Sequence, residues 1–369
     1  MTTLNASHNV PVERRLPGVK EVRENFHVSR RSRSTFMGVV IFAIPTLLYL
    51  ASFLGMIFFT PWWAKIACAA GVTFFIPVLF IIGHDACHGS LTPRAWLNRL
   101  IGRITFLPAL HVFSVWEYGH NGLHHGWTNL RGKDLVWAPF SKQDYDRLPA
   151  FRRWVERVYR SPIGVGVYYI VEMWARFGMT CWQGWGRNRI VPKFYLARFG
   201  VACFAVAQVW ALILFSRFAE SNPLSQWWSS IVIVAVGVVL PFLLWNWFMG
   251  FTVFLHHTHE RVAWYDNETE WSYYAGQVRG VVHVRFPRLM ELILHNIMDH
   301  TAHHVDPRIP LYNLTAAQTD LERAYAEDVV VAPWTLRQFL RTLRVCQLYD
   351  YENHQWLDFA GNPTSGRTV

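Results

Sequence analysis

The stretch IACAAGVTFFIPVLFIIGHDACH, residues 66–88, decides the fold because it joins an uncharged apolar run directly to a pair of histidines. Another uncharged apolar run, 36–59, precedes it and is separated from it only by residues 60–65. A second pair of apolar runs follows at 199–215 and 231–254. A membrane helix needs about 20 such residues, within a range of roughly 17–25. We therefore predict four transmembrane helices in two hairpins, at about 36–59, 66–83, 199–215 and 231–254.

The distribution of charge predicts the orientation of these helices. The chain is 52% hydrophobic and only 16% charged, where a soluble protein carries about a quarter. Its net charge of +10 does not form a nucleic-acid footprint, and we expect no nucleic-acid partner. The two hairpin turns contain only Lys65 and Arg217, whereas the termini and the long segment 84–198 are rich in Lys and Arg. By the positive-inside rule, those basic segments face the cytoplasm.

Three regions follow from this topology. We predict a basic cytoplasmic N-terminal segment at 1–35, a membrane domain at 36–304, and a cytoplasmic cap at 305–369 that belongs to the same domain. Segments 148–160 and 165–177 have the pattern of amphipathic helices lying at the membrane surface. Within the cap, 315–325 and 334–349 read as helices. The expected fold is an all-α integral membrane protein whose cytoplasmic helical cap holds a histidine-rich site.

The histidines are clustered at the predicted cytoplasmic ends of the helices. Residues three or four apart on a helix share a face. We therefore expect His84 with His88, His120 with His124, and His300 with His303 and His304 each to point at one place. Together with His125, three main clusters supply eight imidazoles: His84, His88, His120, His124, His125, His300, His303 and His304.

Eight imidazoles exceed the needs of one metal ion, since a structural zinc takes four protein ligands and a catalytic zinc three. Two metals are the simpler inference. Imidazole binds Zn, Cu, Fe and Ni, so ligand type alone does not choose among them. The apolar surroundings favour redox chemistry on a lipid-like substrate, for which iron with O₂ is the usual agent. Asp85 and Asp299 are candidates for holding imidazole tautomers, or are simply polar residues at helix ends.

The order H-x-x-x-H, H-x-x-x-H-H and H-x-x-H-H, separated by two hydrophobic hairpins, resembles the three histidine boxes of membrane fatty acid desaturases. Further matches resemble the Δ12 (omega-6) branch, here in its bacterial form. They are His257-Thr258-His259, His295-Asn296-Ile297, the 304–312 segment HVDPRIPLY, and Gly126-Trp127-Thr128-Asn129-Leu130 followed by Asp134. This resemblance makes His257, His259 and His295 further candidate ligands.

The resemblance implies an activity. Two irons activate O₂, electrons arrive one at a time, and two hydrogens leave adjacent methylenes to give a cis double bond and water. The implied substrate is an acyl-lipid or acyl-CoA, taken from the bilayer, and the implied location is the bacterial cytoplasmic membrane. The five cysteines form no C-x-x-C pair. A separate donor, ferredoxin-like or cytochrome b5-like, is therefore expected to supply the electrons.

Two departures keep alternatives open. Plant-type relatives carry a further histidine directly after the first box, whereas Gly89 stands here. The first box also resembles that of carotenoid ketolases, so a carotenoid ketolase or hydroxylase, or an acyl hydroxylase, is the alternative within this superfamily. An alternative of another class is a metal transporter. It is disfavoured because transporters carry polar ligands inside their spans, and these spans have almost none.

Overall fold

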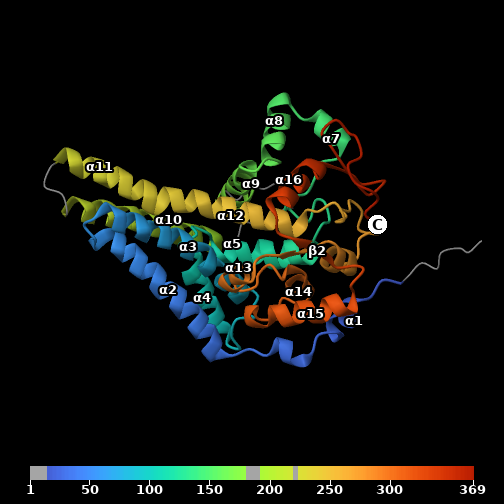
Figure 1. The fold of residues 1–369 in the computed structure, drawn as a ribbon, viewed down its shortest axis with the longest axis horizontal. Coiled ribbons are helices and arrows are strands. Elements are labelled where there is room, and N and C mark those ends of the chain that lie inside the picture. Colours follow the sequence, from blue (N-terminus) through green and yellow to red (C-terminus); the bar gives the residue numbers. More distant parts are fainter. Residues whose placement is uncertain (1–14, 180–191, 219–222) are drawn as a thin grey trace, which may run out of the picture.

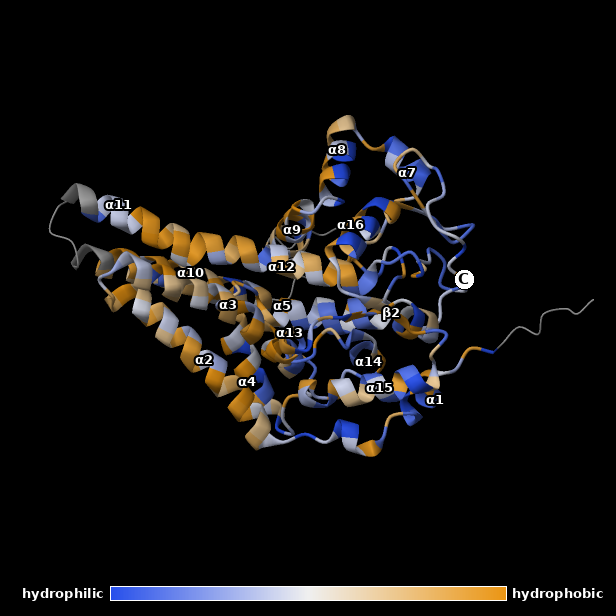
Figure 2. Cartoon of the chain, viewed as in Figure 1, coloured by the Kyte–Doolittle hydropathy of each residue, from blue (hydrophilic) through white to orange (hydrophobic). Residues whose placement is uncertain are grey.

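The computed structural model describes residues 15–179, 192–218 and 223–369. Figure 1 shows long helices extending to one side of the molecule and short helices and strands gathered at the other. The long elements are α2 (Thr35–Phe58), α3 (Trp62–Cys87), α10 (Pro192–Phe218), and a continuous helix made of α11 (Pro223–Val234), the π-helical segment η4 (Ala235–Val239) and α12 (Leu240–His257). Apolar residues dominate these helices, whereas polar residues dominate the opposite side (Figure 2).

The prediction of four membrane helices is confirmed. Among the described residues, four segments are long and apolar enough to cross a membrane: Thr35–Phe58, Trp62–Cys87, Phe194–Phe215 and Gln226–His257. The second and fourth extend further than predicted, because the helices continue through the histidines. His84 therefore lies inside α3, and His257 ends α12. Within α2, the Thr46 and Ser52 hydroxyls donate to carbonyls one turn earlier, which satisfies these groups without water.

The rest of the described chain forms a cap over the histidine-bearing ends of these helices. Its helices are α1 (Val19–Glu24), α4 (Ala95–Phe106), α5 (Phe113–Glu117), α6 (His125–Trp127), α7 (Lys142–Arg147), α8 (Ala150–Tyr159), α9 (Gly164–Tyr168), α13 (Arg288–Ile293), α14 (His300–Val305), α15 (Leu314–Ala324) and α16 (Leu336–Val345). Two segments are 3₁₀-helical: η1 (Val28–Arg31) and η6 (Leu311–Asn313). Three further segments are π-helical: η2 (Tyr118–His124), η3 (Tyr169–Met179) and η5 (Ala275–Arg279).

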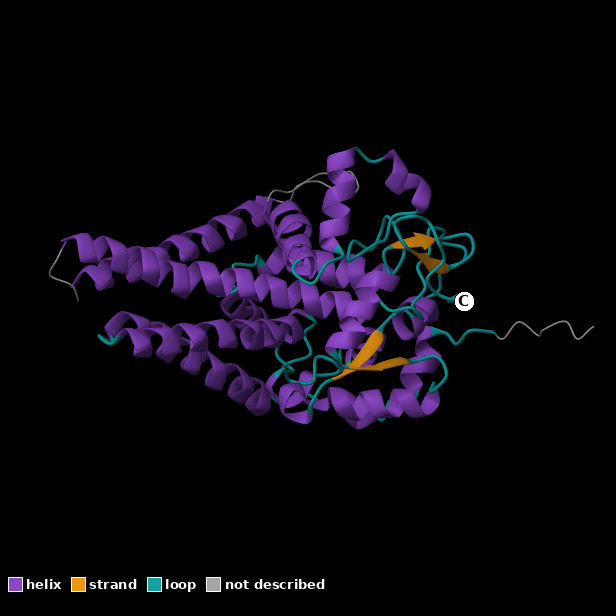
Figure 3. Cartoon of the chain, turned by 45° about the horizontal axis from the view of Figure 1, so that its top comes forward, coloured by secondary structure: helices purple, strands orange, loops and turns teal. Residues whose placement is uncertain are grey.

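The cap is not purely helical, which corrects a detail of the all-α expectation. Strand β1 (Val282–Arg285) pairs in parallel with β2 (Val330–Pro333), and β3 (Leu348–Asp350) pairs antiparallel with β4 (Gln355–Leu357), as Figure 3 shows. The valines of β1 and β2, and the aromatic residues Tyr349 and Trp356 of β3 and β4, favour extended strands. The helix predicted over 334–349 ends at Val345, and strand β3 follows. The helices predicted over 148–160, 165–177 and 315–325 are present as α8, α9 with η3, and α15.

The N-terminal segment is fixed to the cap by ion pairs. Arg31 pairs with Asp306 at 2.6 Å, and Arg30 pairs with Asp320 at 2.8 Å. Asp306 directly follows α14, whose residues include three of the clustered histidines. The segment before the first membrane helix therefore helps to hold the last histidine cluster in place.

Close helix packing beside the site depends on two glycines. A Cβ on Gly250 of α12 would lie 2.1 Å from the carbonyl oxygen of Val165 in α9. A Cβ on Gly166 would lie 2.7 Å from the Cα of Trp247. Small residues at such a crossing let two backbones approach closely. The contact positions α9, and the π-helical segment η3 that continues it, against α12.

We expect Gly250→Ala to destabilise the protein by about 1–3 kcal/mol, because the methyl group forces α9 away from α12. The measurement is the melting temperature of the purified protein in detergent. Gly200→Ala is the matched control, since Gly200 lies in α10 and a Cβ there would meet nothing within 4 Å. Equal melting temperatures for the two variants would contradict the packing argument.

Candidate metal centre

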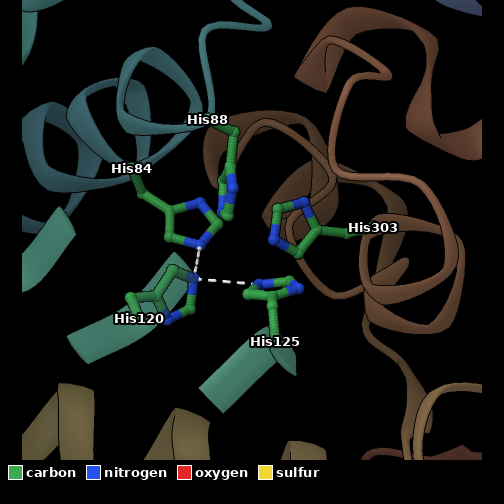
Figure 4. A group of neighbouring side chains, drawn as sticks. All are labelled: His84, His88, His120, His125 and His303. Atoms are coloured by element: carbon green, nitrogen blue, oxygen red, sulfur yellow. Dashed lines mark hydrogen bonds between the residues drawn. The ribbon is translucent and has the colours of Figure 1, made fainter. Parts of the chain in front are cut away.

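Five histidines from four segments meet where α3 joins the cap. His84 lies in α3, His88 directly follows it, His120 lies in η2, His125 begins α6, and His303 lies in α14. One ring nitrogen from each lies within 4.8 Å of the others. The Nε2 atoms of His84 and His120 are 2.7 Å apart, and those of His120 and His125 are 3.1 Å apart. Figure 4 shows the five rings facing a common centre. We call these residues the five-histidine group.

A second group of four histidines lies beside the first. His124, His257, His300 and His304 are all buried, and their ring nitrogens also lie within 4.8 Å of one another. The Nε2 atoms of His124 and His257 are 3.2 Å apart, and those of His300 and His304 are 3.1 Å apart. The four-histidine group thus joins the second and third clusters to the last turn of α12.

The two groups divide the clusters differently from the sequence-based expectation. His120 was expected to converge with His124, and His303 with His304. Instead His120 is grouped with His125, five residues along the chain, while His124 and His304 belong to the other group. The physical reason is the π-helical geometry of η2, whose i→i+5 bonding widens the turn. On α14, His300 and His304 share one face, and His303 points to the neighbouring group.

Two buried side chains orient the imidazoles of the four-histidine group from behind. The Asp134 carboxylate accepts from Nδ1 of His124 at 3.0 Å, and the Gln277 amide oxygen accepts from Nδ1 of His304 at 2.7 Å. A donating Nδ1–H leaves the Nε2 lone pair free to face the group's centre. The Gln277 amide also donates to the His125 carbonyl at 2.8 Å, so this residue connects the two groups.

The electrostatics of both groups suit a cation. Burial lowers the pKa of His88, His120, His125, His300, His303 and His304 well below the ordinary value, and the neighbouring imidazoles lower it further. Neutral imidazoles are the form that binds metals. Nε2 of His88 and both ring nitrogens of His303 are buried without a hydrogen-bond partner among the described residues. A metal ion at the centre of the five-histidine group would take Nε2 of His88 and one ring nitrogen of His303 as ligands, since imidazole binds several first-row metals.

The remaining candidates lie around the groups rather than in them. His259 accepts a bond from the backbone N–H of Arg261 through its Nδ1 atom. His295 has a left-handed backbone with φ of 50°, and its buried Nε2 has no partner among the described residues. The carboxylate of Asp85 is buried, with one oxygen likewise unpartnered. His257 alone among the three additional histidines joins a group.

Asp299 is bonded to side chains outside the two groups. Its carboxylate accepts from Thr315 at 2.7 Å and pairs with His283 Nε2 at 3.1 Å. His283 also contacts Glu322 through Nδ1. Burial alone would lower the pKa of His283, but the bonds to Asp299 and Glu322 outweigh it and raise the pKa to about 9. The protonated imidazole therefore ties β1 and α15 to the residue that precedes α14.

Two apolar pockets lie next to the histidines, and we call them the two arms of the cavity. One arm lies between α3 and α12 and is lined by residues such as Phe80, Trp245 and Met249. The other lies between α5 and η3 and includes Leu110 and Phe177. Six residues line both arms: Trp116, His120, His124, Val136, Tyr169 and Met173. The two arms therefore adjoin each other beside the histidine groups.

Sequence reasoning did not find Gln277 or the cavity. Gln277 belongs to no histidine cluster, and a lone glutamine among apolar residues carries no signal of its role. The cavity lining comes from six helical segments (α3, α5, η2, η3, α12 and α14) and from loops, so its membership appears only after folding. Asp134 belongs to a motif that the sequence shows, and its place ten residues after His124 is the feature from which their hydrogen bond could have been inferred.

Comparison with known proteins identifies relatives of this architecture. The family model described as "Fatty acid desaturase" matches residues 60–335. The chain is 28% identical over 282 residues to an sn-1 oleoyl-lipid 12-desaturase of Picosynechococcus sp., covering 76% of this chain and 75% of that protein. It is 26% identical over 306 residues to the chloroplastic omega-6 fatty acid desaturase of Arabidopsis thaliana, covering 81% of this chain and 62% of the relative. A similar relative from Glycine max is covered over 60% of its length, so this chain spans less than two thirds of these plant proteins.

We expect Asp134→Ala to destabilise the protein strongly, whatever its metal content. The carboxylate is fully buried and also accepts from the backbone N–H groups of Asn129 and Val136. Each buried donor left without an acceptor costs about 1–3 kcal/mol. Thermal unfolding of the variant is the measurement, and Asp146→Ala is the control because that carboxylate is half exposed and bound only to Lys142. A melting temperature as high as the control's would refute this role of Asp134.

Proposed function

The chain belongs to the fatty acid desaturase family, and we propose that it inserts a cis double bond at the Δ12 (omega-6) position of a lipid-bound acyl chain. The family membership rests on a match over most of the chain. The Δ12 position rests on relatives named as oleoyl-lipid 12-desaturases and omega-6 desaturases. The observation that carries the proposal is that two adjoining apolar pockets are lined by histidines of both groups. Because the chain belongs to a family of enzymes, the metal-transporter alternative has no support.

Each histidine group is proposed to hold one iron. The five-histidine group would use His84, His88, His120, His125 and His303, and the four-histidine group His124, His257, His300 and His304. When bound, such a pair of irons supplies the oxidising power of O₂ that an unactivated methylene requires. No positioned base would suffice, because an alkyl C–H has no useful acidity. His259, His295, Asp85 and Asp299 are assigned supporting positions rather than ligation.

The protein's own residues hold the substrate and keep water out. An acyl chain bent at the cavity junction would place one methylene pair against His120 and His124, with one arm taking each end of the chain. Phe80 and Trp245 line one arm beside Trp116, and the ring centroids of Trp116 and Trp245 lie 4.9 and 4.6 Å from that of Phe80. Pockets lined by apolar and aromatic side chains bind apolar ligands by excluding water. The depth of each arm would then select the bond position.

The reaction also needs electrons and protons from outside. The acyl chain loses two hydrogens, a donor supplies two electrons, solvent supplies two protons, and O₂ leaves as two waters. We propose a separate one-electron donor, ferredoxin-like or cytochrome b5-like, that docks on the cap. The excess of basic residues in the cap and its long segments supports a cytoplasmic position for the termini and the site, in a bacterial cytoplasmic membrane.

Expression in a host that makes oleoyl lipids but no dienoic chains should yield acyl chains with double bonds at Δ9 and Δ12. The measurement is gas chromatography of fatty acid esters, with the bond positions fixed by mass spectrometry. His303→Ala should abolish the product, because His303 is buried in the five-histidine group. His27→Ala, at an exposed histidine before the first membrane helix, should leave it unchanged.

Immunoblotting of membranes shows whether each variant accumulates, so a loss of product is separable from a loss of protein. A new bond at another position would reject the Δ12 assignment while keeping the family. Changed carotenoids with unchanged acyl chains would reject the substrate. Full activity of His303→Ala would reject its assignment as a ligand.

Iron analysis tests the division into two groups. The purified protein should contain two irons per chain, and His257→Ala should contain about one, because the four-histidine group loses a quarter of its ligands. His259→Ala is the matched control two residues away, since His259 belongs to neither group, and it should retain both irons. If both variants lose iron equally, or neither does, the assignment of His257 is wrong.

A further inference from the structure

Helix α4 packs against the protein along one face and exposes the opposite face, which we call its open face. Its buried residues include Gly102, Thr105 and Phe106, and Phe106 stacks on Phe80 of α3 with ring centroids 4.3 Å apart. The opposite face exposes Trp96, Leu100 and Ile104, at 62%, 48% and 38% of their surface. Three large apolar side chains at helical spacing on one open face are an unusual exposure for a surface in water.

The same face carries three arginines without acidic partners. Arg94, Arg99 and Arg103 are exposed, and none forms an ion pair with a carboxylate in the part of the chain that the structure describes. The sequence contains no Asp or Glu between Asp85 and Glu117. In contrast, Arg30 and Arg31 of the N-terminal segment are both paired. The arginines of α4 are therefore available to an external anion.

The position of α4 indicates what that anion is. The helix follows α3 and lies beside the start of α2, as Figure 1 shows. A Cβ on Gly38 of α2 would lie 2.5 Å from the Thr92 side chain that precedes α4, so the two segments are in direct contact. Phe36, in the first turn of α2, is 75% exposed. The exposed apolar side chains of α4 therefore lie close to the start of membrane helix α2, which exposes apolar side chains of its own.

We propose that this surface, which we call the α4 face (Arg94, Trp96, Arg99, Leu100, Arg103 and Ile104), binds the phosphate groups of anionic phospholipids. Arginine forms paired hydrogen bonds to phosphate oxygens, and its long stem lets the charge reach the headgroups from a partly immersed helix. Trp96 fits the level of the headgroups, where tryptophan is enriched. Leu100 and Ile104 contact the acyl chains. An acidic soluble protein would satisfy the arginines but leave the apolar stripe without a partner.

The α4 face has a direct connection to the cavity. The chain leaves α4 at Phe106 and within five residues reaches Leu110 and His111, which line the second arm. Binding of headgroups to α4 therefore fixes the height of that arm relative to the bilayer surface. The proposal rests only on the chain spanning a membrane and does not depend on the Δ12 activity.

The test uses the purified full-length protein in a neutral detergent. Its melting temperature is followed during titration with dihexanoyl phosphatidylglycerol or, separately, dihexanoyl phosphatidylcholine. We expect the anionic lipid to raise the melting temperature at concentrations where the zwitterionic lipid does not. The triple variant Arg94→Gln, Arg99→Gln, Arg103→Gln should need about tenfold more anionic lipid for the same rise.

A matched triple variant controls for net charge. Arg323→Gln, Arg337→Gln and Arg344→Gln remove three exposed arginines from α15 and α16, and should respond like the unmodified protein. The Arg→Lys triple at 94, 99 and 103 provides a second folded variant if the Gln variant is unstable, and should keep part of the response. Equal loss in both Gln triples, or equal responses to the two lipids, would overturn the proposal.

A protein partner gives a different result. If the α4 Gln triple responds normally to anionic lipid but loses turnover with a protein electron donor, and keeps turnover with a small-molecule reductant, the face is a protein docking surface. That outcome would also overturn the proposal. Because the lipid titration needs no turnover, its failure is distinguishable from failure of the Δ12 assignment.

Discussion

The mutual approach of nine imidazoles, seven of them buried, is the constraint on which the rest of this structure depends. Ring nitrogens as close as 2.7 and 3.1 Å are contributed by α3 and by η2 and α6 of the cap, and α12 and α14 supply the remaining rings. Removing so many polar nitrogens from water is costly unless each finds a partner. Asp134 and Gln277 supply partners on the outer side, and two centres remain on the inner side. The long helices, the cap and the N-terminal ion pairs all serve to bring these rings together.

This constraint explains why the fold combines rigid helices with a π-helical turn. An ordinary α-helical turn would place His120 and His124 on the same face. The wider turn of η2 instead sends them to different groups and aligns His120 with His125. The extra residue that a π-helical turn contains is thus part of the site's geometry, in keeping with the frequent occurrence of π turns at functional sites. The two arms of the cavity adjoin at the same place, because His120 and His124 of η2 line both.

Much of the fold was predictable from sequence, because long apolar runs and charge asymmetry are local signals. The four membrane helices and the gathering of the histidine clusters followed from them. The division of the histidines did not follow, since it depends on whether a turn closes with four or five residues. Gln277 could not be found because its role comes from contacts with residues that lie 27 and 152 positions away. The short strands escaped prediction for a similar reason, since β1 pairs with a segment almost fifty residues later.

The membership of the two groups also has a consequence for biosynthesis. The five-histidine group needs His303 as well as His84, and the four-histidine group needs His300 and His304 as well as His124. Neither set is complete until the ribosome has translated past residue 304, when every membrane helix has already been made. Under the proposed assignment, iron cannot guide the insertion of the helices. It is acquired by a protein that is already threaded through the bilayer, so metal supply governs maturation rather than assembly.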